Sequence, residues 1–509
     1  MIETGPAFEG RGFYLHAAWQ YEYPFAVRRW DRDDYAGMFR LLCAMGFNHV
    51  MIWPMTELAP PPLSPEDRRH FETFREVVRS ARDLGLECWL VFCANLTTTE
   101  NVRADAFQDR VLYPNMRKLR LDDAAEFKAY MKHMRAILGC INNADGYVFI
   151  DGDPGGYPGA VPRDFMRMLE GVRSIIQSSA VGTPKIIPWV WSGWGSNGEE
   201  MGNIWDVDLQ QYVRPFLAAL REQPPKEPWE LLLGRSIRDG HANGRVNVVL
   251  GGEADLLNRS TLLTYEIIEF EPTPPAFVVQ FSDIRRVIRE ELPLAPTVRG
   301  IMGNAQQPVC AIQNLFYFSR CVDDPQWLDK TDEEVLSAFA EFLGGDASVL
   351  VPAWQSSQRG LHEIPVSLSA KVREGTLTSD AAQLLPGGPS LYLTILAEFV
   401  ETRRAILKHT RRQPCTADEA GQQLAEVAVV MLRWWGRHRY VSTGDLGTEF
   451  RWKFVNRVLM EPLYEWLQRL AIRVESVSEE VAERMAETGL ITRATAGKNV
   501  IELLSRMRA

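Results

Sequence analysis

The sequence lacks the segments that would place a protein in or across a membrane. No apolar run of about 18 residues occurs in the 509-residue chain, so we expect no membrane-spanning helix. The first residues, MIETGPAFEGRGFYLHAAW, do not have the basic start and apolar core of a secretory signal. We therefore expect a cytoplasmic protein that has no membrane partner.

Basic clusters and paired cysteines are also missing. The formal net charge is −10 and no block of Lys and Arg stands out, which disfavours a nucleic-acid partner. The seven cysteines are scattered and odd in number, which is typical of reduced thiols rather than of a disulfide framework. The composition leaves the oligomeric state open, a homo-oligomer included.

The motifs of common cofactor and metal sites do not occur. No G-x-G-x-x-G loop follows the first predicted strand, and there is no G-x-x-x-x-G-K-[ST], G-x-S-x-G or H-E-x-x-H pattern. The stretch GGEADLLN at 251–258 has acidic residues but no histidine beside them. We therefore expect neither a cofactor nor a metal.

What the sequence does contain is a regular alternation of apolar runs and amphipathic stretches. This pattern indicates parallel strands covered by helices, and eight repeats predict a (β/α)8 barrel over residues 1–310. A doubly wound open sheet is the alternative. The predicted strands are 11–19, 48–55, 87–95, 146–150, 185–195, 229–234, 262–271 and 297–307.

Beyond residue 310 the strand-like runs stop and long amphipathic stretches follow. Thr331 and Glu334 predict a capping box at the start of one helix, and Pro462 predicts a kink in the last one. We therefore predict a C-terminal helical domain over residues 311–509. Its predicted helices are 331–345, 390–412, 416–439 and 448–476.

The C-terminal ends of the predicted strands collect aromatic rings, amides and carboxylates. A parallel barrel carries its chemistry at this end. Rings stack on the faces of sugars, and amides share hydrogen bonds with hydroxyl groups, so the pattern predicts a carbohydrate substrate. The candidate binding residues are His16, Trp19, Trp53, Asn95, Trp191, Trp194, Asn304 and Gln306.

Two pairs of acids stand at strand ends and are the candidate catalytic groups. Asp151 and Asp153 follow the apolar run of GYVFIDGDPGGYPG, and Glu266 and Glu269 lie in LLTYEIIEF. Cleavage of a glycosidic bond needs an acid and a carboxylate partner. We predict that Asp153 is the acid and that Glu266 or Glu269 activates water. In the alternative, Asp151 polarises an N-acetyl group while Asp153 protonates the leaving oxygen.

Several of these residues also have a purely structural interpretation. Asp153 precedes a proline and is a common type of turn former. His16 fits a hydrogen-bonded core histidine, and Trp53 fits a side chain that fills the end of the barrel. Glu266 is harder to explain this way, because a carboxylate among apolar residues must find a partner or shift its pKa.

The stretch from 298 to 345 resembles the end of the barrel and the start of the helical domain in bacterial α-glucuronidases. YEIIEFEPTPPAF is similar to the seventh-strand segment of that family, in which an acidic residue is the catalytic base. GDPGGYPG is similar to its fourth-strand loop, but the general-acid Glu of the family falls on Gly155 here. The residues that match after the eighth strand are Asn314, Tyr317, Phe318, Arg320, Asp324 and Pro325.

The neighbouring acids Asp151 and Asp153 also resemble the fourth-strand pair of barrel β-N-acetylhexosaminidases. Together these resemblances imply a glycoside hydrolase, and we expect an exo-acting one. A substrate-assisted hexosaminidase-like enzyme is one alternative. Because Gly155 replaces the acid of the family, a catalytically inactive carbohydrate-binding barrel is another, and a sugar isomerase or lyase is a third.

Overall fold

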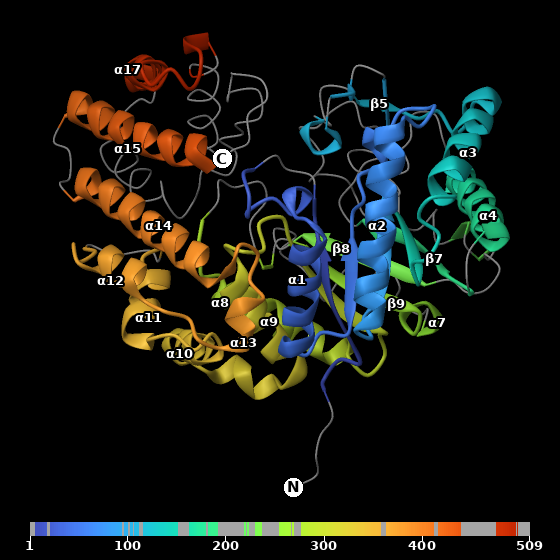
Figure 1. The fold of residues 1–509 in the computed structure, drawn as a ribbon, viewed down its shortest axis with the longest axis horizontal. Helices are drawn as coiled ribbons and strands as arrows, with labels where there is room; N and C mark the ends of the chain where they lie inside the picture. The colour runs from blue at the N-terminus through green and yellow to red at the C-terminus, as the bar shows by residue number, and fades with distance from the viewer. Residues whose placement is uncertain are drawn as a thin grey trace, which may run out of the picture.

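The computed structural model describes most of the barrel and most of the helical region (Figure 1). No helix in the described part is both long and apolar enough to cross a membrane. The described residues are 6–17, 21–93, 96–99, 102–104, 106–110, 116–150, 162–179, 182–191, 218–219, 221–222, 230–236, 254–265, 267–268, 276–357, 363–411, 416–438, 475–494 and 496.

Eight parallel strands close into a barrel, which confirms the predicted (β/α)8 fold and excludes the open sheet. Their order round the barrel is β1, β10, β9, β8, β7, β6, β3 and β2. The strands are β1 (Gly10–Leu15), β2 (His49–Ile52), β3 (Glu87–Phe92), β6 (Gly146–Ile150), β7 (Lys185–Trp191), β8 (Leu231–Ser236), β9 (Ser260–Tyr265) and β10 (Gly300–Ala305).

Most of the predicted strands were too long at their C-terminal ends, as β1 and β9 show. β1 ends at Leu15, not at residue 19, and β9 ends at Tyr265, not at residue 271. Ile267 and Ile268 continue the apolar run of β9 but lie in a bend, where both are fully buried. Apolar character therefore continued past the point where strand pairing stopped.

Helices cover the outside of the barrel, and their ends follow the signals in the sequence. Gly46 ends α1 in the left-handed region at φ 96°, which glycine adopts without strain. Ser64 and Asp67 form a capping box at the start of α2, with Pro65 in its first turn. The barrel helices are α1 (Arg32–Met45), α2 (Pro65–Asp83), α3 (Ala124–Leu138), α4 (Pro162–Ser179), α7 (Ala254–Leu257), α8 (Phe281–Glu291) and α9 (Ile312–Asp323).

A short hairpin lies between β3 and α3, and the sequence analysis did not predict it. Its strands are β4 (Leu96–Thr98) and β5 (Met116–Lys118), with the 3-10 helix η4 (Phe107–Asp109) between them. Arg110 fixes this insertion to α2 because its Nη1 donates to Asp67 Oδ1 at 2.5 Å and to Leu58 O at 2.7 Å. Arg110 is 1% exposed and Asp67 is fully buried.

The described residues after α9 are helical, and their helices pack on one side of the barrel (Figure 1). They confirm a C-terminal helical region, and the predicted capping box of Thr331 and Glu334 is present. Most of the predicted helix at 448–476, with Pro462, lies outside the described residues. The helices are α10 (Asp332–Phe342), α11 (Ala347–Gln355), α12 (Leu368–Glu374), α13 (Asp380–Gln383), α14 (Gly388–Thr410), α15 (Ala417–His438) and α17 (Glu475–Ala486).

The helix α9 belongs to the barrel wall although it follows residue 310. The ring of Phe318 in α9 stacks on that of Phe47, which lies between α1 and β2, with 6.2 Å between the ring centroids. A domain boundary at residue 310 stays a prediction, and the packing of α9 favours a boundary after this helix.

Charged side chains close the N-terminal end of the barrel. Glu87, Lys185 and Glu230 stand at or just before the first residues of β3, β7 and β8. Lys185 Nζ lies 2.6 Å from Glu87 Oε1 and 2.7 Å from Glu230 Oε1. The ring of His49 packs edge-on against Trp89 above them at 3.8 Å. Among the described residues, these charged groups therefore fill the N-terminal end of the barrel.

Candidate functional site

The structure describes part of the predicted site. His16, Trp53, Asn304 and Gln306 are described in full, and Trp191 is the last residue of β7. The other predicted site residues lie outside the described residues, so their convergence stays a prediction. They are Trp19, Asn95, Asp151, Asp153, Trp194, Glu266 and Glu269.

Aromatic rings from four strands meet near the C-terminal end of the barrel. The ring of His16 lies 4.8 Å from that of Trp53 and 6.2 Å from that of Tyr265, both edge-on. Trp189 lies 5.7 Å from Tyr14 and 6.4 Å from Tyr265. We call this group the aromatic floor, and its members are Tyr14, His16, Trp53, Trp189 and Tyr265.

The direction of these side chains follows from the register of the barrel. Residues paired in adjacent parallel strands point to the same side of the sheet. Tyr14 pairs with Asn304 of β10, and Trp189 pairs with Leu232 of β8. The contact between Tyr14 and Trp189, from strands that are not neighbours, shows that this side is the inside of the barrel.

His16 is a neutral side chain within the floor. It is 3% exposed, and burial lowers the pKa of its imidazole to about 3. Among the described residues, no group forms a hydrogen bond with its buried Nδ1. At neutral pH, His16 therefore contributes a hydrogen-bonding ring but no charge.

Amides from the end of β10 lie beside the floor. Asn304 is fully buried, and Gln306 and Gln307 are nearly so. Gln306 Nε2 lies 3.4 Å from the hydroxyl oxygen of Tyr265. The C-terminal end of the barrel therefore brings together rings and amides from β1, β2, β7, β9 and β10. Four of these residues, His16, Trp53, Asn304 and Gln306, are among the binding residues named from the sequence.

Sequence reasoning missed Tyr14, Trp189, Tyr265 and Glu57 in this neighbourhood. Trp189 and Tyr265 could have been found from alternation, since each stands two residues after a strand residue on the same face, Ile187 and Leu263. Glu57 gave no such signal, because it lies in the loop TELAPPPL. Its carboxylate is buried and accepts the indole N–H of Trp53 at 2.9 Å.

Asn314, one of the residues that carry the family resemblance, braces the chain after β9. Its Nδ2 donates to Ile268 O at 2.9 Å and to Val278 O at 2.7 Å, and its Oδ1 accepts from Gln280 N at 3.0 Å. In the sequence, Ile268 lies between the two candidate glutamates. Asn314 therefore fixes the backbone next to the predicted catalytic base.

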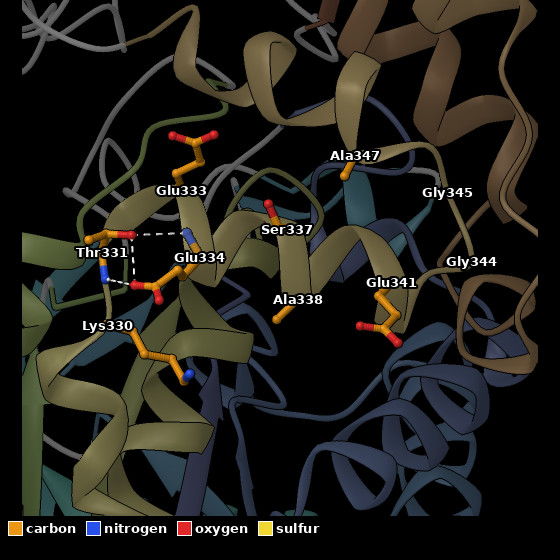
Figure 2. Close-up of a pocket in the computed structure, with 10 residues that line it drawn as sticks. All are labelled: Lys330, Thr331, Glu333, Glu334, Ser337, Ala338, Glu341, Gly344, Gly345 and Ala347. Carbon is orange, nitrogen blue, oxygen red and sulfur yellow. Dashed lines mark hydrogen bonds between the residues drawn. The ribbon is translucent and has the colours of Figure 1, made fainter.

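A groove lies along α10 in the helical region (Figure 2). Glu334 is held there by the capping box with Thr331, and Glu333 and Glu341 line the same groove. Within the described residues, no group of three or more His, Cys, Asp or Glu side chains could hold a metal ion. Three glutamates and one lysine line the groove, and we assign no function to it.

No family model and no curated relative matches the chain. Among solved structures, it is similar to a GH138 enzyme targeting pectin rhamnogalacturonan II, with a TM-score of 0.47 and 10% identity over 92% of this chain and 84% of the other. It is also similar to an O-GlcNAc hydrolase mutant of Thermobaculum terrenum, with a TM-score of 0.46 and 13% identity over 95% and 97%. At such low scores and identities, the likeness identifies neither a substrate nor a reaction for this chain.

Proposed function

We propose that the protein is a glycoside hydrolase that acts at the C-terminal end of its barrel. The observation that carries this proposal is the meeting of neutral rings and amides from five strands at that end. Flat rings and neutral amides complement the apolar faces and hydroxyl groups of a sugar. The proposed binding residues are those named from the sequence, together with Tyr265.

The proposed catalytic acids follow two strands that lie on different sides of the mouth. β6 and β9 are three positions apart in the ring of eight strands, which is nearly opposite. Asp151 and Asp153 come directly after β6, and Glu266 comes directly after β9. In this proposal, Asp153 protonates the leaving oxygen and Glu266 or Glu269 activates water. An inverting enzyme needs these two carboxyl groups about 6.5–9.5 Å apart.

An exo-acting enzyme fits the closed lower part of the barrel. Charged side chains lie at the N-terminal end of the barrel, and the aromatic floor packs across its interior. A site with a single entrance suits the end of a sugar chain better than its middle. A cytoplasmic location and a homo-oligomer stay predictions from the sequence.

A panel of 4-nitrophenyl glycosides tests the proposal. Wild type should cleave at least one of them. Asp153→Asn should abolish turnover of the alkyl glycoside of the same sugar, whose leaving oxygen needs a proton, and should slow cleavage of the 4-nitrophenyl glycoside less, because 4-nitrophenolate is a good leaving group. Asp145→Asn is the matched control, because Asp145 precedes the same strand at the opposite end and pairs with Arg82 at 3.0 Å. The control should keep its activity.

The other predicted functions give different results in the same experiment. Proton NMR of the first-formed anomer reports inversion for the pair Asp153 and Glu266, and retention for a substrate-assisted reaction by Asp151 and Asp153. A binding barrel would cleave nothing, although sugars would still raise its melting temperature. Loss of activity on chelation would instead favour an isomerase or lyase.

A further inference from the structure

Glu57 is a buried carboxylate at the mouth end of the barrel that has no role in the reaction proposed above. It is 6% exposed and lies in the 3-10 helix η2 (Thr56–Leu58), just after β2. Trp53 Nε1 donates to its Oε2 at 2.9 Å, and the backbone N–H of Cys93 donates to its Oε1 at 2.5 Å. One carboxylate therefore ties together the ends of β2 and β3.

Stability of the fold alone does not explain a buried carboxylate at this position. Taking a charge out of water is costly, and an apolar residue of similar size often stabilises a fold as well or better. No Lys or Arg in the described ranges forms an ion pair with Glu57, which is held by hydrogen bonds alone. Burial raises the pKa of its carboxyl group, and hydrogen bonds from the backbone and from Trp53 oppose that shift.

The opposite end of the barrel has a matching pair with a different environment. Trp89 Nε1 donates to Glu87 Oε1 at 2.8 Å, nearly the same distance as between Trp53 and Glu57. There, Lys185 neutralises the carboxylate from 2.6 Å. The pair at the closed end is thus part of a charge-balanced plug, whereas the pair at the mouth has no counter-ion among the residues described.

The contacts of Glu57 continue into the candidate site. The carboxylate of Glu57 fixes the orientation of Trp53. The indole ring of Trp53 packs edge-on against His16 at 4.8 Å, with an angle of 67° between the rings. The backbone oxygen of Glu57 also accepts from Thr98 Oγ1 at 2.6 Å, which joins the hairpin of β4 and β5 to η2. A rotation of the Trp53 ring would therefore disturb the aromatic floor at its centre.

We propose that Glu57 is a positioning residue of the enzyme: it holds the indole ring of Trp53 in the one orientation that supports substrate binding. This inference rests on the proposed function, because it assumes that Trp53 belongs to the sugar site. Glu57 acts only through Trp53. Glu57 preorganises the indole ring of Trp53, since a binding group must be held by its neighbours before the substrate arrives.

A double-mutant cycle on kcat/KM tests this proposal with the aryl glycoside that wild type cleaves. Glu57→Gln keeps the side-chain size but replaces one acceptor oxygen by a donor, and Trp53→Phe removes the ring N–H. We expect each variant to lower kcat/KM about tenfold, the loss of one charge-assisted hydrogen bond. Because both variants weaken or remove the contact between Trp53 and Glu57, the double variant should be no worse than Trp53→Phe alone.

Glu87→Gln is the matched control, because it breaks the equivalent indole contact at the closed end. It should lower the melting temperature but leave kcat/KM unchanged, and its effect should not couple to that of Trp53→Phe. If Glu57 had only a structural role, Glu57→Gln and Glu87→Gln would behave alike: each would lower the melting temperature, and neither would change kcat/KM.

The outcomes separate this inference from the proposed function. If wild type cleaves no glycoside, the proposed function fails and the positioning role falls with it. Suppose that wild type is active. If the losses of kcat/KM in Glu57→Gln and Trp53→Phe multiply in the double variant, or if Glu57→Gln is as active as wild type, only the positioning role is overturned. Should Glu57→Gln fail to fold, Trp53→Phe decides, since unchanged kcat/KM in that variant overturns the role.

Discussion

Replacing Asn314 by alanine should damage both stability and activity, because this one amide holds three backbone groups. The change removes the hydrogen bonds to Ile268 O and Val278 O and the one from Gln280 N. Val278 O keeps a partner, since Gln313 Nε2 donates to it at 3.1 Å. Two buried groups, Gln280 N and Ile268 O, are left without the amide.

The expected cost follows from those two groups. A buried backbone group that loses its partner costs about 1–3 kcal/mol, so Asn314→Ala should lower the free energy of unfolding by about 3 kcal/mol or more. Urea denaturation measures this change. Because Ile268 stands between Glu266 and Glu269 in the sequence, the variant should also lose kcat under conditions in which it remains folded.

Asn48→Ala provides the control. Asn48 also bridges two backbone groups, accepting from Arg11 N at 2.9 Å and donating to Glu9 O at 2.8 Å. It is exposed and lies before β2, at the N-terminal end of the barrel, so water replaces its hydrogen bonds and the cost should stay below about 1 kcal/mol. Equal losses of stability in the two variants, or full activity of Asn314→Ala, would refute this reasoning.

Two further predictions concern buried charge. Asp67→Ala removes the buried carboxylate that contacts the guanidinium of Arg110 and should cost about 3–5 kcal/mol in urea denaturation. Glu76→Ala, which breaks an exposed ion pair, should cost less than about 1 kcal/mol; similar values for the two would contradict the argument. Burial lowers the pKa of His16 to about 3 and of His49 to about 4. The unfolded chain therefore binds protons below about pH 6.5 that the folded chain does not, so stability should fall from pH 7 to pH 5, and a flat profile would contradict this.

The fold could be predicted from the sequence wherever a local signal coincided with the final packing. The strands of a parallel barrel are buried on both faces, so each appears as a continuous apolar run, as in the segment that became β6. Helix ends were equally clear, because Ser64 and Gly46 act through their own neighbours in the chain. These features need no distant partner.

The features that the sequence did not reveal depend on distant partners or on weak local patterns. β4 and β5 are three residues long, too short to show alternation. The helix α11 contains Pro352, which argues against a helix in a sequence taken alone. Glu57 gains its role from Cys93, 36 residues further along the chain. Such a pairing has no signature in either segment.

The most direct test of the account is a crystal structure of the Asp153→Asn variant soaked with the glycoside that wild type cleaves. We predict a sugar ring seated above the aromatic floor, with its glycosidic oxygen beside residue 153 and its anomeric carbon within reach of a water held by Glu266 or Glu269. A sugar bound outside the barrel mouth, or acids after β6 and β9 that both point away from it, would contradict the account.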